Sequence, residues 1–244
     1  MKILFSFLCF ASYSLSAQQN SKDIIKKMYQ RYSGKWYHIF TFDQTTENYR
    51  NDSLIRTATW NEAISYPDNF RIDFGDIKNG NGVIFKKDSA YNFRNGKLGK
   101  VSVNNNDLTF LLGGMYFYSF DSVINKLSSL GYDLNKFHED KWQGRDAYVI
   151  GADNLNEKTN QLWIDKENLY VARFIKFENG RKEEGLLNDH KKFGGGWAET
   201  SCIFYIDDKL FQKEIYHDCK ADVVIDPKVF EPVLFGTAHW YQPK

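Results

Sequence analysis

Short runs in which apolar and polar residues alternate constrain this chain more than any other feature. In residues 70–74, for example, Phe70, Ile72 and Phe74 alternate with two charged residues. A period of two is that of a β-strand, so these apolar side chains share one face. Comparable runs recur between turn signals rich in Asn, Gly and Asp. Aromatic residues form 17% of the chain and Pro occurs only 4 times. We therefore predict an antiparallel meander.

Two helical patterns interrupt the predicted strands. Residues 21–32 carry apolar side chains at helical spacing, which predicts an amphipathic helix with Ser21 as its N-cap. The apolar segment 108–118 is followed by the same spacing in residues 120–130, which Gly131 ends. A sheet of about ten antiparallel strands tends to curl, and an open one needs helices over its concave apolar face. We expect the two helical segments to supply that cover.

The N-terminus has the form of a secretory signal peptide. Lys2 is followed by the apolar run 3–11 and by small residues up to Ala17. The run is too short to span a bilayer as a stable helix. We therefore predict a cleaved leader at residues 1–17 and an exported mature chain without a transmembrane span.

Net charge and the positions of the prolines limit the class of partner and the number of domains. Lys and Arg number 32 against 31 Asp and Glu, a formal net charge of +1, which gives no electrostatic reason to expect a nucleic-acid partner. No Pro lies between Pro67 and Pro227, so no proline-rich linker divides the chain. We predict one domain at residues 18–244, acting as a monomer.

Two cysteines, Cys202 and Cys219, remain after the leader and lie on successive predicted strands. If Asp208 and Lys209 form a two-residue turn, Cys202 faces Ile215. Cys219 then lies four residues further on, or ~13 Å at ~3.4 Å per residue. A disulfide requires Cα atoms within ~7 Å. We expect two free thiols.

No residue pattern stands out as a catalytic or metal-binding motif. The densest groups of possible ligands, residues 138–140 and 217–219, each lack the further ligands that a structural zinc needs. His38 alternates with Trp36 and Phe40, which favours a hydrogen-bonded core histidine over a catalytic base. We expect no catalytic residue, no metal site and no cofactor.

Several short motifs resemble those of a known family. Residues 144–150 read Gly-Arg-Asp-Ala-Tyr-Val-Ile, residues 163–165 read Trp-Ile-Asp, and residues 224–232 contain Ile, Asp, Phe and Pro at characteristic spacings. Together with the order of elements over about residues 20–235, they resemble the periplasmic lipoprotein-sorting family of the LolA, LolB and RseB groups.

The resemblance implies a mainly β fold, an open antiparallel half-barrel of ten or eleven strands. Its concave face, covered by the N-terminal helix and the mid-chain helical insertion, would hold acyl chains. The candidate cavity-wall residues are Trp60, Phe70, Ile72, Phe74, Phe85 and Phe93. The alternative for each of them is ordinary core. The family's lid-holding Arg has no clear counterpart, and we expect Arg56 and Arg71 to face solvent.

The sequence thus predicts an exported, periplasmic, non-enzymatic carrier of lipid or lipoprotein acyl chains, which could also contact an envelope membrane protein. One alternative is an envelope sensor of the same fold that binds a regulatory protein. Another is a secreted hydrolase that uses carboxylates of the concave face. Bound lipid favours the carrier, a stoichiometric protein partner the sensor, and turnover lost on one carboxylate substitution the enzyme.

Overall fold

One open antiparallel sheet of thirteen strands organises the computed structural model, which describes residues 20–155 and 158–240. The leader predicted at residues 1–17 lies outside the described residues. The first six strands are β1 (Ile39–Arg50), β2 (Ser53–Ser65), β3 (Asn69–Phe74), β4 (Gly82–Lys86), β5 (Ser89–Arg94) and β6 (Lys97–Val103). The others are β7 (Phe137–Trp142), β8 (Arg145–Ile150), β9 (Gln161–Asp165), β10 (Val171–Glu178), β11 (Arg181–Asn188), β14 (Ser201–Ile206) and β15 (Lys209–Ala221).

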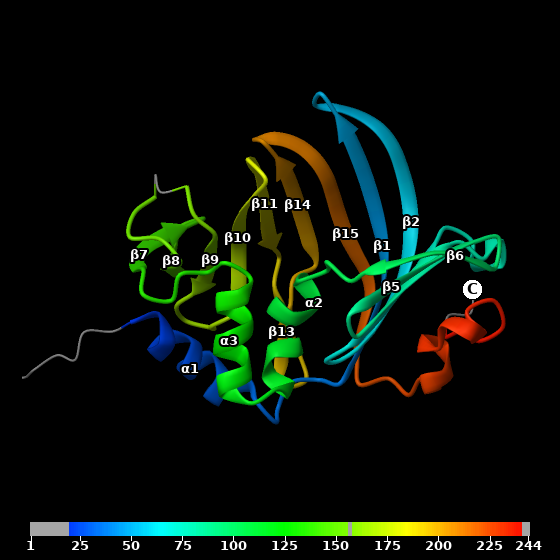
Figure 1. The fold of residues 1–244 in the computed structure, drawn as a ribbon, viewed down its shortest axis with the longest axis horizontal. Helices are drawn as coiled ribbons and strands as arrows, with labels where there is room; N and C mark the ends of the chain where they lie inside the picture. Colours follow the sequence, from blue (N-terminus) through cyan, green and yellow to red (C-terminus); the bar gives the residue numbers. More distant parts are fainter. Residues whose placement is uncertain (1–19, 156–157, 241–244) are drawn as a thin grey trace, which may run out of the picture.

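The strand order is β6-β5-β4-β3-β2-β1-β15-β14-β11-β10-β9-β8-β7, so β6 and β7 are the two open edges (Figure 1). Strand β15 pairs with β1 and thereby joins the first meander to the second. A separate hairpin of β12 (Lys191–Phe193) and β13 (Gly196–Ala198) lies outside this sheet. The predicted fold class is confirmed, with more strands than the ten or eleven expected.

Strands β6, β7 and β11 account for the excess, because their sequences alternate weakly. Strand β6 is exposed along nearly its whole length, and β7 and β11 are rich in charged residues. Strands β6 and β7 are edges, and an edge strand that faces water needs no continuous apolar face, so the period of two is weak in its sequence. Strand β11 lies inside the sheet between β14 and β10, and there the charged residues 181–184 hide the period of two.

The N-terminal helix α1 (Ser21–Tyr32) forms as predicted, but its N-cap is Asn20 and not Ser21. The Asn20 side chain accepts a hydrogen bond of 3.1 Å from the Asp23 amide. The Ser21 hydroxyl instead donates to the Lys136 carbonyl at 2.8 Å. This bond ties the start of α1 to the segment before β7.

The predicted mid-chain insertion forms α2 (Leu108–Leu111), the 3-10 turn η2 (Gly114–Phe117) and α3 (Phe120–Ser129). Tyr29 of α1 donates to the Tyr118 carbonyl at 2.7 Å, which joins the two helical segments. Figure 1 shows α1, α2 and α3 on one side of the curved sheet, and their apolar side chains share one core cluster with the strands. No helix among residues 20–155 and 158–240 is both long enough and apolar enough to cross a membrane.

The opposite, outer face of β2–β5 is covered by the C-terminal turns η3 (Pro227–Phe230) and η4 (Pro232–Leu234). Arg71, expected to face solvent, is completely buried beneath this segment and pairs with Asp73. Arg56 is exposed, as expected. The alternation of Phe70 to Phe74 therefore separates two buried faces, one of which buries an ion pair.

Two further expectations require correction. His38 is exposed and its ring packs edge-on against Phe117, because regular alternation begins at Ile39 and Tyr37 takes the inward position. Cys202 pairs with Glu214 and not with Ile215, because the β14–β15 turn is one residue earlier and a bulge follows Phe204. Both cysteines are free thiols.

Candidate functional site

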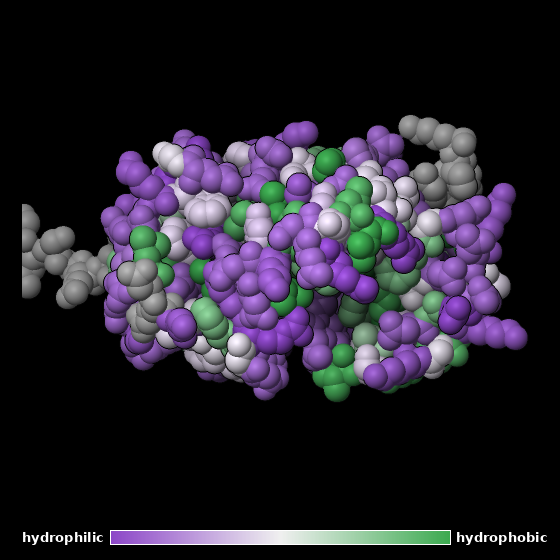
Figure 2. All heavy atoms as spheres, turned by 90° about the horizontal axis from the view of Figure 1, so that it is seen from above, coloured by the Kyte–Doolittle hydropathy of each residue, from purple (hydrophilic) through white to green (hydrophobic). Residues whose placement is uncertain are grey.

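The concave face holds two adjoining hollows beneath the helical insertion. The larger one, which we call the outer hollow, has a volume of about 620 Å³. Its apolar walls are Trp60, Ile72, Phe74, Val83, Phe85, Leu108, Leu111, Leu130, Tyr132, Phe174, Phe204 and Phe211. A volume of this size lies within the ~300–1,000 Å³ common for small-molecule sites. Figure 2 shows apolar side chains in a hollow of the upper surface, bordered by polar ones.

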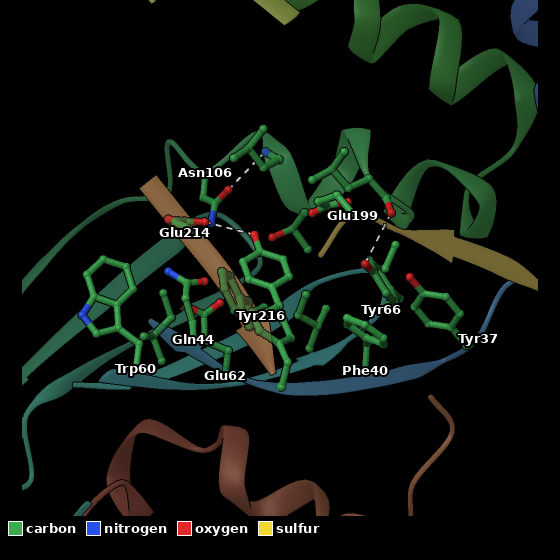
Figure 3. A pocket seen from close by; sticks show the side chains of 18 of the residues that line it. Tyr37, Phe40, Gln44, Trp60, Glu62, Tyr66, Asn106, Glu199, Glu214 and Tyr216 are labelled. Atoms are coloured by element: carbon green, nitrogen blue, oxygen red, sulfur yellow. Dashed lines mark hydrogen bonds between the residues drawn. The ribbon is translucent and has the colours of Figure 1, made fainter. Parts of the chain in front are cut away.

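The smaller hollow, the inner chamber, has a volume of about 170 Å³. Its walls include Tyr37, Phe40, Phe42, Gln44, Glu62, Tyr66, Phe70, Asn106, Leu112, Glu199, Glu214 and Tyr216 (Figure 3). Trp60, Ile72, Leu108 and Phe204 border both spaces. The two spaces are therefore continuous parts of one groove.

Five of the six predicted wall residues line this groove. Trp60 and Phe74 meet edge to face in the outer hollow, with ring centroids 5.0 Å apart. Phe85 lines the outer hollow and stacks on Phe70 of the inner chamber at 5.7 Å. Ile72 borders both.

Phe93, the sixth, lies on the outer face of the sheet and not in the groove. Its ring stacks on Phe235 of the C-terminal segment at 4.0 Å and clusters with Ile84. On β5 it is Ala90 and Asn92 that line the outer hollow. Alternation groups residues by face but does not say which face is concave, and here the outer face is also apolar because the C-terminal segment covers it.

An ion pair spans the outer hollow between the sheet and the insertion. Lys176 of β10 lies 2.7 Å from Asp107, the residue that precedes α2, and both side chains are half-buried. Burial alone would lower the pKa of Lys176, but the hydrogen bond and charge of Asp107 outweigh it, and the net shift is upward. This contact tethers the insertion over the hollow.

Three glutamates project into the inner chamber from different elements: Glu62 from β2, Glu199 from the segment before β14, and Glu214 from β15 (Figure 3). They are 4%, 8% and 7% exposed. Glu214 accepts hydrogen bonds from Tyr216 at 3.0 Å and from Gln212. The carboxyl of Glu62 makes neither a hydrogen bond nor an ion pair with the described part of the chain.

Burial and mutual repulsion make these carboxyls hard to ionise. Burial, with a smaller contribution from Glu214 and Glu199, raises the pKa of Glu62 well above its usual range. Burial raises the pKa of Glu199 to about 8. The pKa of Glu214 is also raised by burial, although its hydrogen bonds from Gln212 and Tyr216 oppose the shift. No Lys or Arg of the described chain is among the groups that set these pKa values.

Sequence reasoning missed this acidic set, although one signal was available. Glu62 lies between Trp60 and Ile64 on the same alternating face, and a charged residue on an apolar face is the unusual feature. Glu199 precedes its strand and Glu214 lies opposite Cys202 only because of the bulge after Phe204, so neither position could be assigned from spacing.

The His-containing clusters of the sequence lie elsewhere. His217 contacts the Thr45 hydroxyl at 3.1 Å on an exposed strand surface, and His138 of edge strand β7 lies 3.9 Å from Asp140. Within the described ranges, no three His, Cys, Asp or Glu side chains come together as a metal site, and this includes the glutamates of the inner chamber.

Solved structures share this fold. A DUF1329 family protein from Desulfovibrio piger aligns with a TM-score of 0.61 at 15% identity, over 86% of this chain and 95% of that one. A LolA superfamily protein from Nitrosomonas europaea gives 0.56 at 12% identity, over 87% and 97%. An outer membrane lipoprotein-sorting protein domain from Vibrio parahaemolyticus gives 0.55 at 12% identity, over 88% and 97%.

At the level of sequence, no family profile matches the chain and no curated protein matches it. The structural alignments nevertheless extend over nearly the whole of each solved chain. The expected likeness to the lipoprotein-sorting fold is therefore confirmed as a likeness of fold.

Proposed function

We propose that this protein is an exported, periplasmic carrier that holds acyl chains of a lipid or lipoprotein in the outer hollow. The observation that carries the proposal is the outer hollow itself, walled by Trp60, Phe74 and Phe85 and covered by the helical insertion. Transfer of an acyl chain from water into such a site contributes about 0.8 kcal/mol per CH₂. A chain of a dozen or more carbons can therefore be retained without any polar contact.

Release requires the cover to move, and the tether allows it. The ion pair of Lys176 and Asp107 is partly exposed to water, with side-chain exposures of 26% and 21%. Pairs in such surroundings stabilise by roughly 0–1 kcal/mol. Breaking this contact alone therefore costs little, and movement of residues 107–112 at the edge of the outer hollow can leave Met115, Val123 and Leu127 of the insertion packed in the core.

A binding role also accounts for the acidic groups better than hydrolysis does. No Ser or His among the described residues lines the inner chamber, so its wall offers Glu62 and Glu199 neither a serine nucleophile nor a histidine base. Carboxyls with raised pKa values can serve as general acids. The enzyme alternative therefore remains an outcome of the test below.

Titration with a fluorescent 16-carbon fatty-acyl probe tests the proposal. We expect saturable one-to-one binding that an unlabelled phospholipid or lipopeptide with acyl chains displaces, and no breakdown of either. Failure to bind the probe, or turnover of an acyl ester that is lost on substituting Glu62, would exclude the carrier function.

The export part of the proposal has its own test. Because Lys2 and the run 3–11 have signal-peptide form, the mature protein should begin between residues 15 and 20. N-terminal sequencing of the protein from the envelope fraction of its cells measures this directly. Met1 intact on the cell-extracted protein would contradict export.

A further inference from the structure

The inner chamber has the wrong size for an acyl chain but the right position for a head group. Its volume of about 170 Å³ is small beside the 620 Å³ of the outer hollow. The two spaces meet at Trp60, Leu108 and Glu214. A ligand whose tail fills the outer hollow therefore places one end in the inner chamber.

Aromatic rings line that end. Tyr37 stacks on Phe40 at 5.0 Å, and Phe42 stacks on Tyr216 at 4.3 Å. Tyr66 and Trp60 complete the ring-lined wall (Figure 3). A cation near the face of an aromatic ring is attracted by the ring's quadrupole, and cages of rings recognise quaternary ammonium groups in this way.

The unpartnered carboxyl of Glu62 gives the chamber its charge preference. Only 4% of Glu62 is exposed, and the residue lines the chamber. Its carboxyl makes no hydrogen bond or ion pair with the described residues. Glu199 and Glu214 face the same space (Figure 3). Any of these carboxyls that ionises would need a cationic partner, and no Lys or Arg of the described chain lines the chamber.

We propose that the inner chamber binds the ammonium or methylated ammonium head of an amphiphile whose acyl or alkyl tail occupies the outer hollow. This inference rests on the proposed acyl-carrier function and adds to it a class of head group. An ammonium ion supplies a positive counter-charge for the carboxylates of Glu62, Glu199 and Glu214. Methyl groups on the ammonium nitrogen gain contact with the rings of Phe40, Phe42 and Tyr216. A carboxylate head would instead be repelled by each of the three carboxyls that ionises.

Opposite pH dependences follow for cationic and anionic heads. The titratable groups around the chamber are Glu62, Glu199 and Glu214, the phenols of Tyr37, Tyr66 and Tyr216, and the neighbouring thiol of Cys202. Burial raises the pKa of each phenol and of the thiol, so these groups stay neutral below pH 9. Ionisation of the glutamates as the pH rises should then strengthen binding of a quaternary ammonium and weaken binding of a carboxylate.

The test uses three ligands with the same 12-carbon chain: dodecyltrimethylammonium, dodecanol and dodecanoate, each below its micellar concentration. Each displaces the fluorescent acyl probe from the full-length mature protein at pH 6 and pH 8.5. We expect the ammonium ligand to bind about tenfold tighter than the alcohol at pH 8.5, a difference that corresponds to about 1.4 kcal/mol. We expect dodecanoate to bind weakest and to lose affinity as the pH rises.

Glu62→Gln should abolish the preference for the ammonium ligand over dodecanol. Glu183→Gln is the matched control, because Glu183 borders the outer hollow but is exposed to solvent. Glu199→Gln provides a second variant if Glu62→Gln does not fold.

Equal displacement by all three ligands, or tightest binding of dodecanoate, overturns the head-group inference and leaves the acyl-carrier proposal standing. A preference for the ammonium ligand that survives in Glu62→Gln and Glu199→Gln also overturns it. Absence of probe binding by the unsubstituted protein rejects the carrier proposal, and the inference with it.

Discussion

Arg71 and Asp73, two residues apart on β3, form a buried ion pair in which Arg71 Nε lies 2.7 Å from Asp73 Oδ2. The second bond, from Arg71 Nη2 to Asp73 Oδ1, is 2.8 Å long. The guanidinium also donates to the carbonyls of Val229, Phe235 and Ala238 at 2.9, 3.1 and 2.7 Å. Its plane lies over the Phe235 ring at 4.3 Å. Arg71 thus fastens the C-terminal segment to the outer face of the sheet.

Asp73→Asn should destabilise the protein by ~3–5 kcal/mol, because it leaves the buried guanidinium of Arg71 without its counter-charge. Arg50→Met, at an exposed arginine at the end of β1, should change stability by less than ~0.5 kcal/mol. Chemical denaturation measures both. A loss below ~1 kcal/mol in Asp73→Asn would show that the pair is not essential to this face.

Phe74 and Phe93 provide a matched comparison of groove and core. Phe74→Glu places a carboxylate in the outer hollow, where water can hydrate it, and should cost about 1 kcal/mol of stability while reducing binding of the acyl probe. Phe93→Glu buries the charge against Phe235 and should cost several kcal/mol. Denaturation and probe titration of both variants measure the difference. A folded Phe74→Glu with unchanged binding would mean that acyl chains do not occupy the outer hollow.

Lys176→Met should release the tether of the insertion. We expect the exchange rate of the acyl probe to rise several-fold while stability changes by no more than ~1 kcal/mol, since the pair with Asp107 is partly exposed to water. Stopped-flow displacement of the probe measures the rate. Lys100→Met, at an exposed lysine on β6, is the control. Equal exchange rates in the two variants would show that the tether does not limit release.

Glu199 should make stability fall with rising pH. Its pKa rises from an ordinary 4.5 to about 8 on folding because the side chain is buried. A carboxyl whose pKa is raised in the folded state contributes its full share of folding stability below pH 4.5. That stability is lost as the pH rises to about 8. The free energy of unfolding of Glu199→Gln should therefore equal that of the unsubstituted protein at pH 4.5 and exceed it by a few kcal/mol at pH 9. Urea denaturation across this range measures the difference. An identical pH profile in the two proteins would mean that Glu199 ionises normally.

The sequence predicts the architecture well where local periodicity decides it. Three patterns each lie within single elements, and the structure forms those elements: the apolar stripe of α1, the period of two in β1–β5 and the helical spacing of α3. What local periodicity cannot decide is which face of a strand is concave. Phe74 and Phe93 look equivalent in sequence, yet one lines the groove and the other lies under the C-terminal segment.

The acidic part of the site depends on register, which the sequence specifies less well. Glu214 faces Glu62 and Glu199 because β15 lies between β1 and β14 in the sheet. Strands β1 and β15 are neighbours there although they are far apart in the chain. A bulge after Phe204 and the turn at Asp207 and Asp208 set the register of β14 and β15. Similarly, the burial of Arg71 requires a C-terminal segment more than 150 residues away to fold back over β3, as its bond to Val229 across 158 residues shows.

Analysis of lipids that accompany the protein tests the central claim most directly. The protein is purified from the envelope of its own cells without detergent, its mass is measured under native conditions, and its extracted lipids are identified by mass spectrometry. We predict a complex of one protein with one acyl-bearing amphiphile, lost in Phe74→Glu and retained in an exposed-site variant such as Arg50→Met. Protein that is free of lipid when isolated in this way, and that takes up no acyl chain when lipid is added, would contradict the carrier function.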